Sequence, residues 1–145
     1  MGLINFVQAA GAALWENIQG KEAHAAEKLH EHIAMSGLGN PDIAITVEGS
    51  VIRVVGHVKT QEEKEKILLA LGNVAGISSI EEQIAVVEPS KGARFVTVEK
   101  GHTLSAIAKE QYGDANAYMR IFEANKPLLK DPNKIYPGQV LRIPV

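Results

Sequence analysis

Apolar residues in the first twenty positions recur at spacings of three and four. This is the pattern of an amphipathic helix with one apolar stripe, and Gly20 is suited to end it. The stripe consists of Leu3, Phe6, Val7, Ala10, Leu14 and Ile18. Such a helix either docks on the body of a protein or lies on a membrane surface. Because its polar face carries no Lys or Arg, we expect residues 1–20 to dock on the module that follows.

The next segment begins with a helical pattern and continues with two strand patterns. Apolar residues at helical spacing over 21–35 predict a helix, and Asn40-Pro41-Asp42 predicts a turn after it. Alternating apolar residues over 43–47 predict a half-buried strand. The β-branched residues of 51–58 predict its hairpin partner.

A second helix follows the hairpin and leads to a last strand. Thr60 and Glu63 have the spacing of a capping box, in which the threonine hydroxyl accepts from the Glu63 amide and the Glu63 carboxylate reaches back to the Thr60 amide. The helix ends at Gly72, and alternating residues over 80–86 predict the last strand. The predicted order of the whole segment is α-β-β-α-β.

The C-terminal third has its own pattern, in the order β-α-α-β. A short strand reaches Val98, and Thr103 is placed to cap the first of two helices. Pro137-Gly138 suits a type II turn before a closing strand over 140–143. We therefore predict an α+β protein of two small modules. Its parts are a helix over 1–20, a first module over 21–88, a linker over 89–93 and a second module over 94–145.

Length and charge agree with this division. The chain has 145 residues and a net charge of −2, which suits one ordinary domain or two small ones. Residues 1–90 carry six Lys/Arg against twelve Asp/Glu, whereas residues 91–145 carry nine against five. The first module is therefore acidic and the second basic. We expect no nucleic-acid partner, because the net charge of −2 removes the simplest argument for one.

The first module resembles the BON domain over about residues 22–88. The resemblance rests on the α-β-β-α-β order and on Gly72-Asn73-Val74-Ala75-Gly76-Ile77 before the last strand. It implies a binding module, often found near membranes, and not an enzyme.

The second module is similar to a LysM domain over about residues 94–144. The similarity is carried by Val96, Gly101, Thr103, Leu104, Ile107, Tyr112, Gly113, Asn125 and the run from Ile135 to Pro144. It implies a groove for N-acetylglucosamine polymers between the loops 101–105 and 131–136. The candidate glycan-binding residues are Gly101, His102, Thr103, Leu104, Ile135 and Tyr136. His102 departs from the family, which commonly has Asp at this position.

The residue types of catalytic sites are absent or wrongly spaced. The chain has no cysteine, which excludes disulfides, zinc–cysteine sites and thiol nucleophiles. Among the five histidines, His30 and His32 are two apart and point to different faces of a helix. The carboxylates at 62–65 lie in the first turn of a helix, where its dipole stabilises negative charge. We therefore expect a binding protein rather than an enzyme.

The N-terminus indicates the compartment. No Lys or Arg precedes Lys21, and polar residues interrupt the apolar run, so the segment does not look like a secretory signal. No stretch reaches the roughly 18 apolar residues of a transmembrane helix. We expect a cytoplasmic protein with no transmembrane segment.

The chain as a whole resembles the family of bacterial cytoplasmic potassium-binding proteins. The closest stretches are Gly2-Leu3, Asn5-Phe6-Val7, Leu14-Trp15, the run from Glu63 to Leu68, Gly72-Asn73, and Ile121 to the C-terminus. The resemblance implies selective binding of K⁺, and also of larger alkali ions such as Rb⁺ and Cs⁺. It also implies ion-dependent compaction and a role as a sensor or adaptor under high potassium.

The neutral segment 72–80 is the candidate ion site under this resemblance. Backbone carbonyls freed at a helix end are partially negative and need partners. A site built from carbonyls suits K⁺, whereas Mg²⁺ keeps its waters and prefers carboxylates. The candidate carbonyl ligands are those of Val7, Ala10, Gly72, Val74, Ile77 and Ile80.

Two other function classes stay open on the sequence. One is a peptidoglycan-binding envelope module that uses the LysM loops, and the other is an adaptor at a lipid surface that uses the N-terminal helix. For the sensor we expect a monomer with an unidentified protein partner.

Overall fold

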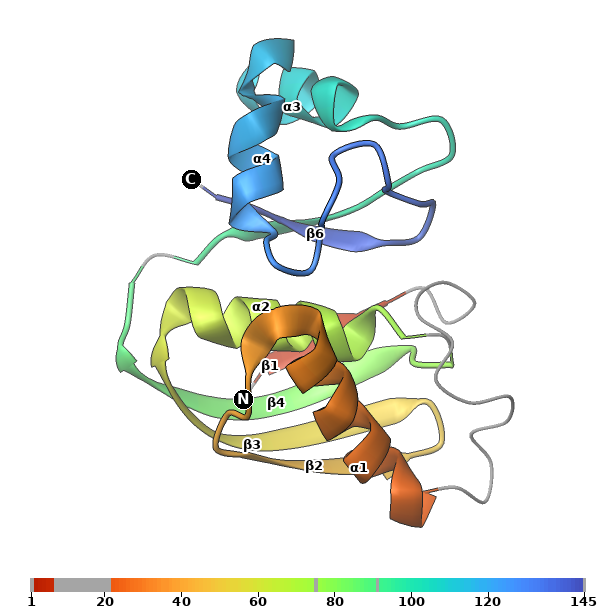
Figure 1. Ribbon diagram of the computed structural model, residues 1–145, viewed down its shortest axis with the longest axis vertical. Coiled ribbons are helices and arrows are strands. Elements are labelled where there is room, and N and C mark those ends of the chain that lie inside the picture. The colour runs from red at the N-terminus through yellow and green to blue at the C-terminus, as the bar shows by residue number, and fades with distance from the viewer. Residues whose placement is uncertain (1, 7–21, 75, 91, 145) are drawn as a thin grey trace.

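The computed structural model describes residues 2–6, 22–74, 76–90 and 92–144. It confirms the α+β class, with an N-terminal lobe built on a four-stranded sheet and a smaller C-terminal lobe (Figure 1). The element orders of both modules follow the predicted α-β-β-α-β and β-α-α-β.

The sheet of the N-terminal lobe has the strand order β1-β4-β3-β2. Strands β2 and β3 form an antiparallel hairpin, whereas β3 and β4 are parallel because helix α2 connects them. The elements are β1 (Gly2–Asn5), α1 (Glu22–Ile33), β2 (Ile43–Glu48), β3 (Val51–Thr60), α2 (Gln61–Gly72) and β4 (Ser79–Glu88).

One face of this sheet carries the core. Alternate residues of the strands, such as Ile52, Val54 and Ile80, are completely buried, while their neighbours are more exposed. Helices α1 and α2 pack on that face through residues such as Leu29 and Leu68. The period-two pattern of the sequence therefore translates directly into an inner and an outer face.

Helix α1 ends in a π-helical turn over Ala34–Leu38. Gly37 has φ +91° there, and a Cβ atom at this position would lie 2.8 Å from Cγ of Pro127 in the C-terminal lobe. Glycine is needed at this position both for the left-handed backbone and for the close approach of the two lobes.

The predicted helix over residues 1–20 is wrong at its start. Residues 2–5 form β1, which pairs antiparallel with β4, with Ile4 opposite Ile80. Without β1, the edge of β4 would have unpaired backbone groups. The spacing of apolar residues in the N-terminal segment contains no information about that distant edge. The rest of the predicted helix, residues 7–20, lies outside the described residues.

The capping prediction for α2 is confirmed, with one difference. The Glu63 amide donates to Oγ1 of Thr60 over 3.2 Å. The Glu63 carboxylate accepts from the Lys59 amide, also over 3.2 Å, rather than from the predicted Thr60 amide. Both interactions satisfy backbone donors at the start of the helix.

The C-terminal lobe packs its helices on a two-stranded antiparallel sheet. Asn125 joins the two layers, because its side-chain amide donates to the carbonyls of Ile121 and Arg142 and accepts from the Arg142 amide. The elements are β5 (Arg94–Thr97), α3 (Leu104–Tyr112), a 3₁₀ turn (Ala115–Ala117), α4 (Tyr118–Ala124) and β6 (Val140–Ile143). Strand β6 lies against α2 of the N-terminal lobe (Figure 1).

Candidate functional site

The turn that follows α2 is held against the N-terminal segment. A Cβ atom at Gly72 would lie 2.0 Å from Cζ of Phe6, so the Phe6 ring occupies the space that any larger residue would fill. The Phe6 amide donates to the Ser78 carbonyl over 2.8 Å. Both ends of the turn therefore contact the residue at which the described part of the N-terminus stops.

Three of the candidate carbonyl ligands lie at the end of α2 and in this turn. Val74 and Ile77 bury their side chains completely, which anchors the turn from inside. The Ile77 amide donates to the Val74 carbonyl over 3.1 Å, and a carbonyl oxygen with one such bond keeps a second lone pair. Gly76 has φ +99°, so the backbone reverses direction between them.

The other candidates lie elsewhere. Ile80 is inside β4, paired with Ile4 on one side and Ile52 on the other, where the sheet supplies ordinary partners for its backbone. Val7 and Ala10 lie outside the described residues. The structure thus places Gly72 at the end of α2, Val74 and Ile77 in the turn that follows, and Ile80 three residues after Ile77, inside β4.

Acidic and histidine side chains do not assemble into a metal site in the part of the chain that the structure describes. No group of three or more His, Asp or Glu residues is found there that would hold an ion. Among the same residues, no helix is both long and apolar enough to cross a membrane.

Asn73 connects the turn to the C-terminal lobe. Its Nδ2 donates to the Val140 carbonyl and its Oδ1 accepts from the Val140 amide, both over 2.8 Å. The side-chain amide thus pairs with the edge of β6 as another strand would. This residue follows a candidate ligand directly, and sequence reasoning assigned it no contact with β6.

A buried ion pair, between Glu65 and Arg142, also joins the two lobes. Oε1 of Glu65 accepts from Nε and Nη2 of Arg142 over 3.0 and 2.9 Å. Oε2 of Glu65 accepts from the Ala93 amide and from the side chain of Gln61. With four donors on one carboxylate, the pair joins helix α2, the segment before β5 and strand β6.

The candidate glycan residues are divided between two places. Thr103 and Leu104 line a hollow of about 270 Å³ on the C-terminal lobe. Ile135 packs on the core of that lobe, and Nδ1 of His102 accepts from the Glu99 amide next to the Gly101 turn. Tyr136 instead lines a cleft between the two lobes. Tyr136 is therefore absent from the hollow of Thr103.

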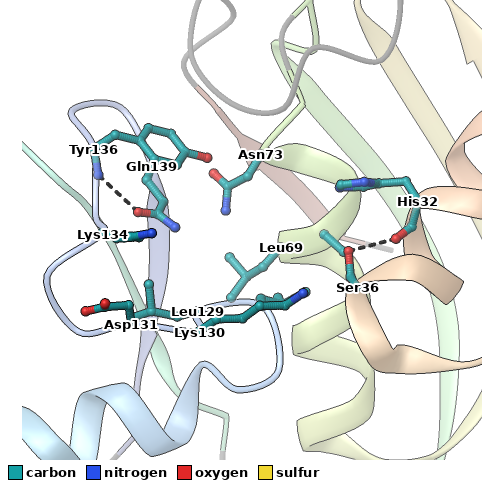
Figure 2. Close-up of a pocket in the computed structure, with 12 residues that line it drawn as sticks. His32, Ser36, Leu69, Asn73, Leu129, Lys130, Asp131, Lys134, Tyr136 and Gln139 are labelled. Carbon is teal, nitrogen blue, oxygen red and sulfur yellow. Dashed lines mark hydrogen bonds between the residues drawn. The ribbon is translucent and has the colours of Figure 1, made fainter.

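That cleft has a volume of about 380 Å³ and is lined by residues of both lobes (Figure 2). The N-terminal lobe contributes His32 and Leu69, and the C-terminal lobe contributes Leu129, Lys134 and Tyr136. Burial lowers the pKa of His32 and raises the pKa of Tyr136, since each charged form loses solvent. Sequence reasoning missed this cleft, because its walls come from residues about 100 positions apart.

Comparisons with known proteins agree with the two-module division. The BON domain family matches residues 21–88, and the LysM domain family matches residues 96–144. A curated protein of Escherichia coli O6:H1 (strain CFT073), called Potassium binding protein Kbp, is 48% identical over 147 aligned positions. The alignment covers 99% of each chain.

Proposed function

Since the chain belongs to the family of Potassium binding protein Kbp, with a BON domain followed by a LysM domain, we propose that it binds K⁺. The observation that carries the proposal is the near full-length similarity to a protein named for this activity. The neutral turn after α2 supports it, because Gly72, Val74 and Ile77 offer backbone carbonyls in a segment without charged residues.

The proposed ligands are the carbonyl oxygens of Val7, Ala10, Gly72, Val74, Ile77 and Ile80. Neutral oxygens replace the weakly held hydration shell of K⁺ but do not compensate the dehydration of Mg²⁺. On the same physical ground, Rb⁺ and Cs⁺ bind as well. The contacts of Phe6 with Gly72 and Ser78 support a site that includes both the N-terminal segment and the turn.

The protein then acts as a sensor in the cytoplasm, as a monomer with a protein partner of unknown identity. An ion shifts a conformational equilibrium only if it binds one conformation more tightly than the other. Asn73 offers a route for that difference, because it sits between candidate ligands and holds Val140 of β6. Ordering of the turn would therefore favour the docked arrangement of the C-terminal lobe.

Isothermal titration with KCl, NaCl and MgCl₂ at matched ionic strength tests the binding. We expect heat of binding with K⁺, a much weaker response to Na⁺ and none to Mg²⁺. Small-angle scattering of the same samples tests the sensor, for which K⁺ lowers the radius of gyration and Na⁺ does not. Equal responses to K⁺ and Na⁺ would refute selective binding.

A glycine substitution tests whether the K⁺ site lies at the turn after α2. Gly72→Ala forces the Phe6 ring away from the turn and should weaken K⁺ binding at least tenfold. Gly49→Ala is the control, because it adds a side chain outside the proposed site, at φ +61° in a turn where no atom beyond its chain neighbours is within 4 Å. If both variants bind K⁺ as the parent does, the site lies elsewhere.

A further inference from the structure

The cleft between the lobes differs from the proposed ion site in its chemistry. Four apolar residues line it, namely Leu69, Ala70, Leu128 and Leu129. The polar side chains of Lys130, Lys134, Tyr136 and Gln139 line it as well. A volume of about 380 Å³ is within the ordinary range of small-molecule sites.

Two side-chain oxygens of the cleft, on Gln139 and Asp131, already accept hydrogen bonds from the backbone. Oε1 of Gln139 accepts from the Tyr136 amide over 3.3 Å, which leaves its Nε2 as a donor. Oδ1 of Asp131 accepts from the Asn133 amide over 2.9 Å, and its carboxylate points away from His32 and Ser36 (Figure 2). The one acid of the lining therefore stabilises its own turn.

The donors, by contrast, have no partner within the described part of the chain. These are the Tyr136 hydroxyl, the Gln139 Nε2 group and the ammonium groups of Lys130 and Lys134. Lys130 extends across the cleft toward Ser36, and the Tyr136 hydroxyl points toward Asn73 (Figure 2). These donors and the two positive charges, beside apolar lining residues, match a ligand with an acceptor-rich anionic end and an apolar body.

We propose that this cleft binds a small organic anion, a carboxylate or a phosphate monoester with a flat apolar body. The anionic end faces Lys134, Tyr136 and Gln139, and the body lies against Leu69 and Leu129. Because the two lobes contribute opposite walls, the bound molecule bridges them. The proposal does not rest on potassium binding.

Three naphthalene probes of nearly equal shape test it: 1-naphthoate, 1-naphthyl phosphate and the neutral 1-naphthamide. Amide chemical shifts of the full chain are followed during titration, in KCl and again in NaCl. We expect saturable shifts at 128–139 and 69–73 with either anion, and at least tenfold weaker binding of the amide. The two anions distinguish a carboxylate site from a phosphate site. If the probe causes the same chemical-shift changes in NaCl, the cleft binds the anion whether or not the protein binds K⁺.

Substitutions in the cleft test which residues bind the anionic end of the probe. Lys134→Gln combined with Tyr136→Phe should weaken naphthoate binding at least tenfold, and Lys100→Gln, an exposed lysine outside the cleft, should leave it unchanged. The amide spectrum of the double variant reports whether the lobes stay folded. Equal binding of naphthamide, no shifts at 5 mM probe, or shifts confined to Thr103–Ser105 would each overturn the proposal.

Discussion

Removing the charge of Glu65 should destabilise the protein far more than removing a surface carboxylate. Glu65 is 3% exposed and Arg142 is 8% exposed, so solvent does not replace a lost partner. The carboxylate accepts four hydrogen bonds, two from Arg142, one from the Ala93 amide and one from Gln61. Glu65→Gln keeps the size of the side chain but replaces one oxygen by a donor.

The expected loss follows from these contacts. Breaking a buried ion pair from one side costs about 3–5 kcal/mol, because the remaining charge is uncompensated. Here the Arg142 guanidinium keeps the Ala124 carbonyl as an acceptor over 2.8 Å and Oε1 of Glu62 at 3.9 Å, so we expect a loss at the lower end, about 3 kcal/mol. With a urea m-value of about 2 kcal/mol per M, the unfolding midpoint falls by about 1.5 M.

Urea unfolding followed by far-ultraviolet circular dichroism measures the change. Glu81→Gln is the matched control, because Glu81 accepts from Arg53 over 2.8 Å but both side chains are 40% exposed or more. Exposed pairs contribute only about 0–1 kcal/mol. A second variant, Glu65→Leu with Arg142→Met, removes both charges and should recover much of the loss. Equal losses for Glu65→Gln and Glu81→Gln would refute the reasoning.

Three further predictions concern other contacts. Asn73→Ala leaves the Val140 amide and carbonyl without these partners and should lower the free energy of unfolding by about 1–3 kcal/mol; in scattering experiments it should also reduce the K⁺-dependent compaction, and an unchanged compaction would contradict the coupling. Burial lowers the pKa of His32 in the folded state, so the unfolded chain takes up its proton first and stability falls as the pH drops below about 6.5. In urea midpoints measured from pH 7.5 to 5.5, His32→Gln should flatten this slope, and an unchanged slope would contradict the reasoning. Asn125→Ala removes three buried hydrogen bonds and should cost about 2–4 kcal/mol, and a loss below 1 kcal/mol in thermal unfolding would contradict it.

Local chemistry in the sequence was enough to predict most of the elements. Alternation over 43–47 marks β2, and Thr60 starts α2, because a helix N-terminus needs a side-chain acceptor within three residues. Thr103 acts in the same way for α3. The lack of cysteine already excluded thiolate ligands from any ion site. These features depend on neighbours within a few positions along the chain.

Contacts between distant segments were decided only by the tertiary structure. Residues 2–5 join the sheet because β4 has a free edge, although their own spacing favours a helix. The sequence places Arg142 in a closing strand and predicts no partner for its charge. In the structure its guanidinium is buried against Glu65, which lies 77 positions earlier. Tyr136 belongs to a predicted glycan loop and lines the cleft instead. Periodicity describes which face of an element is apolar, whereas the packing of one element on another determines what that face meets.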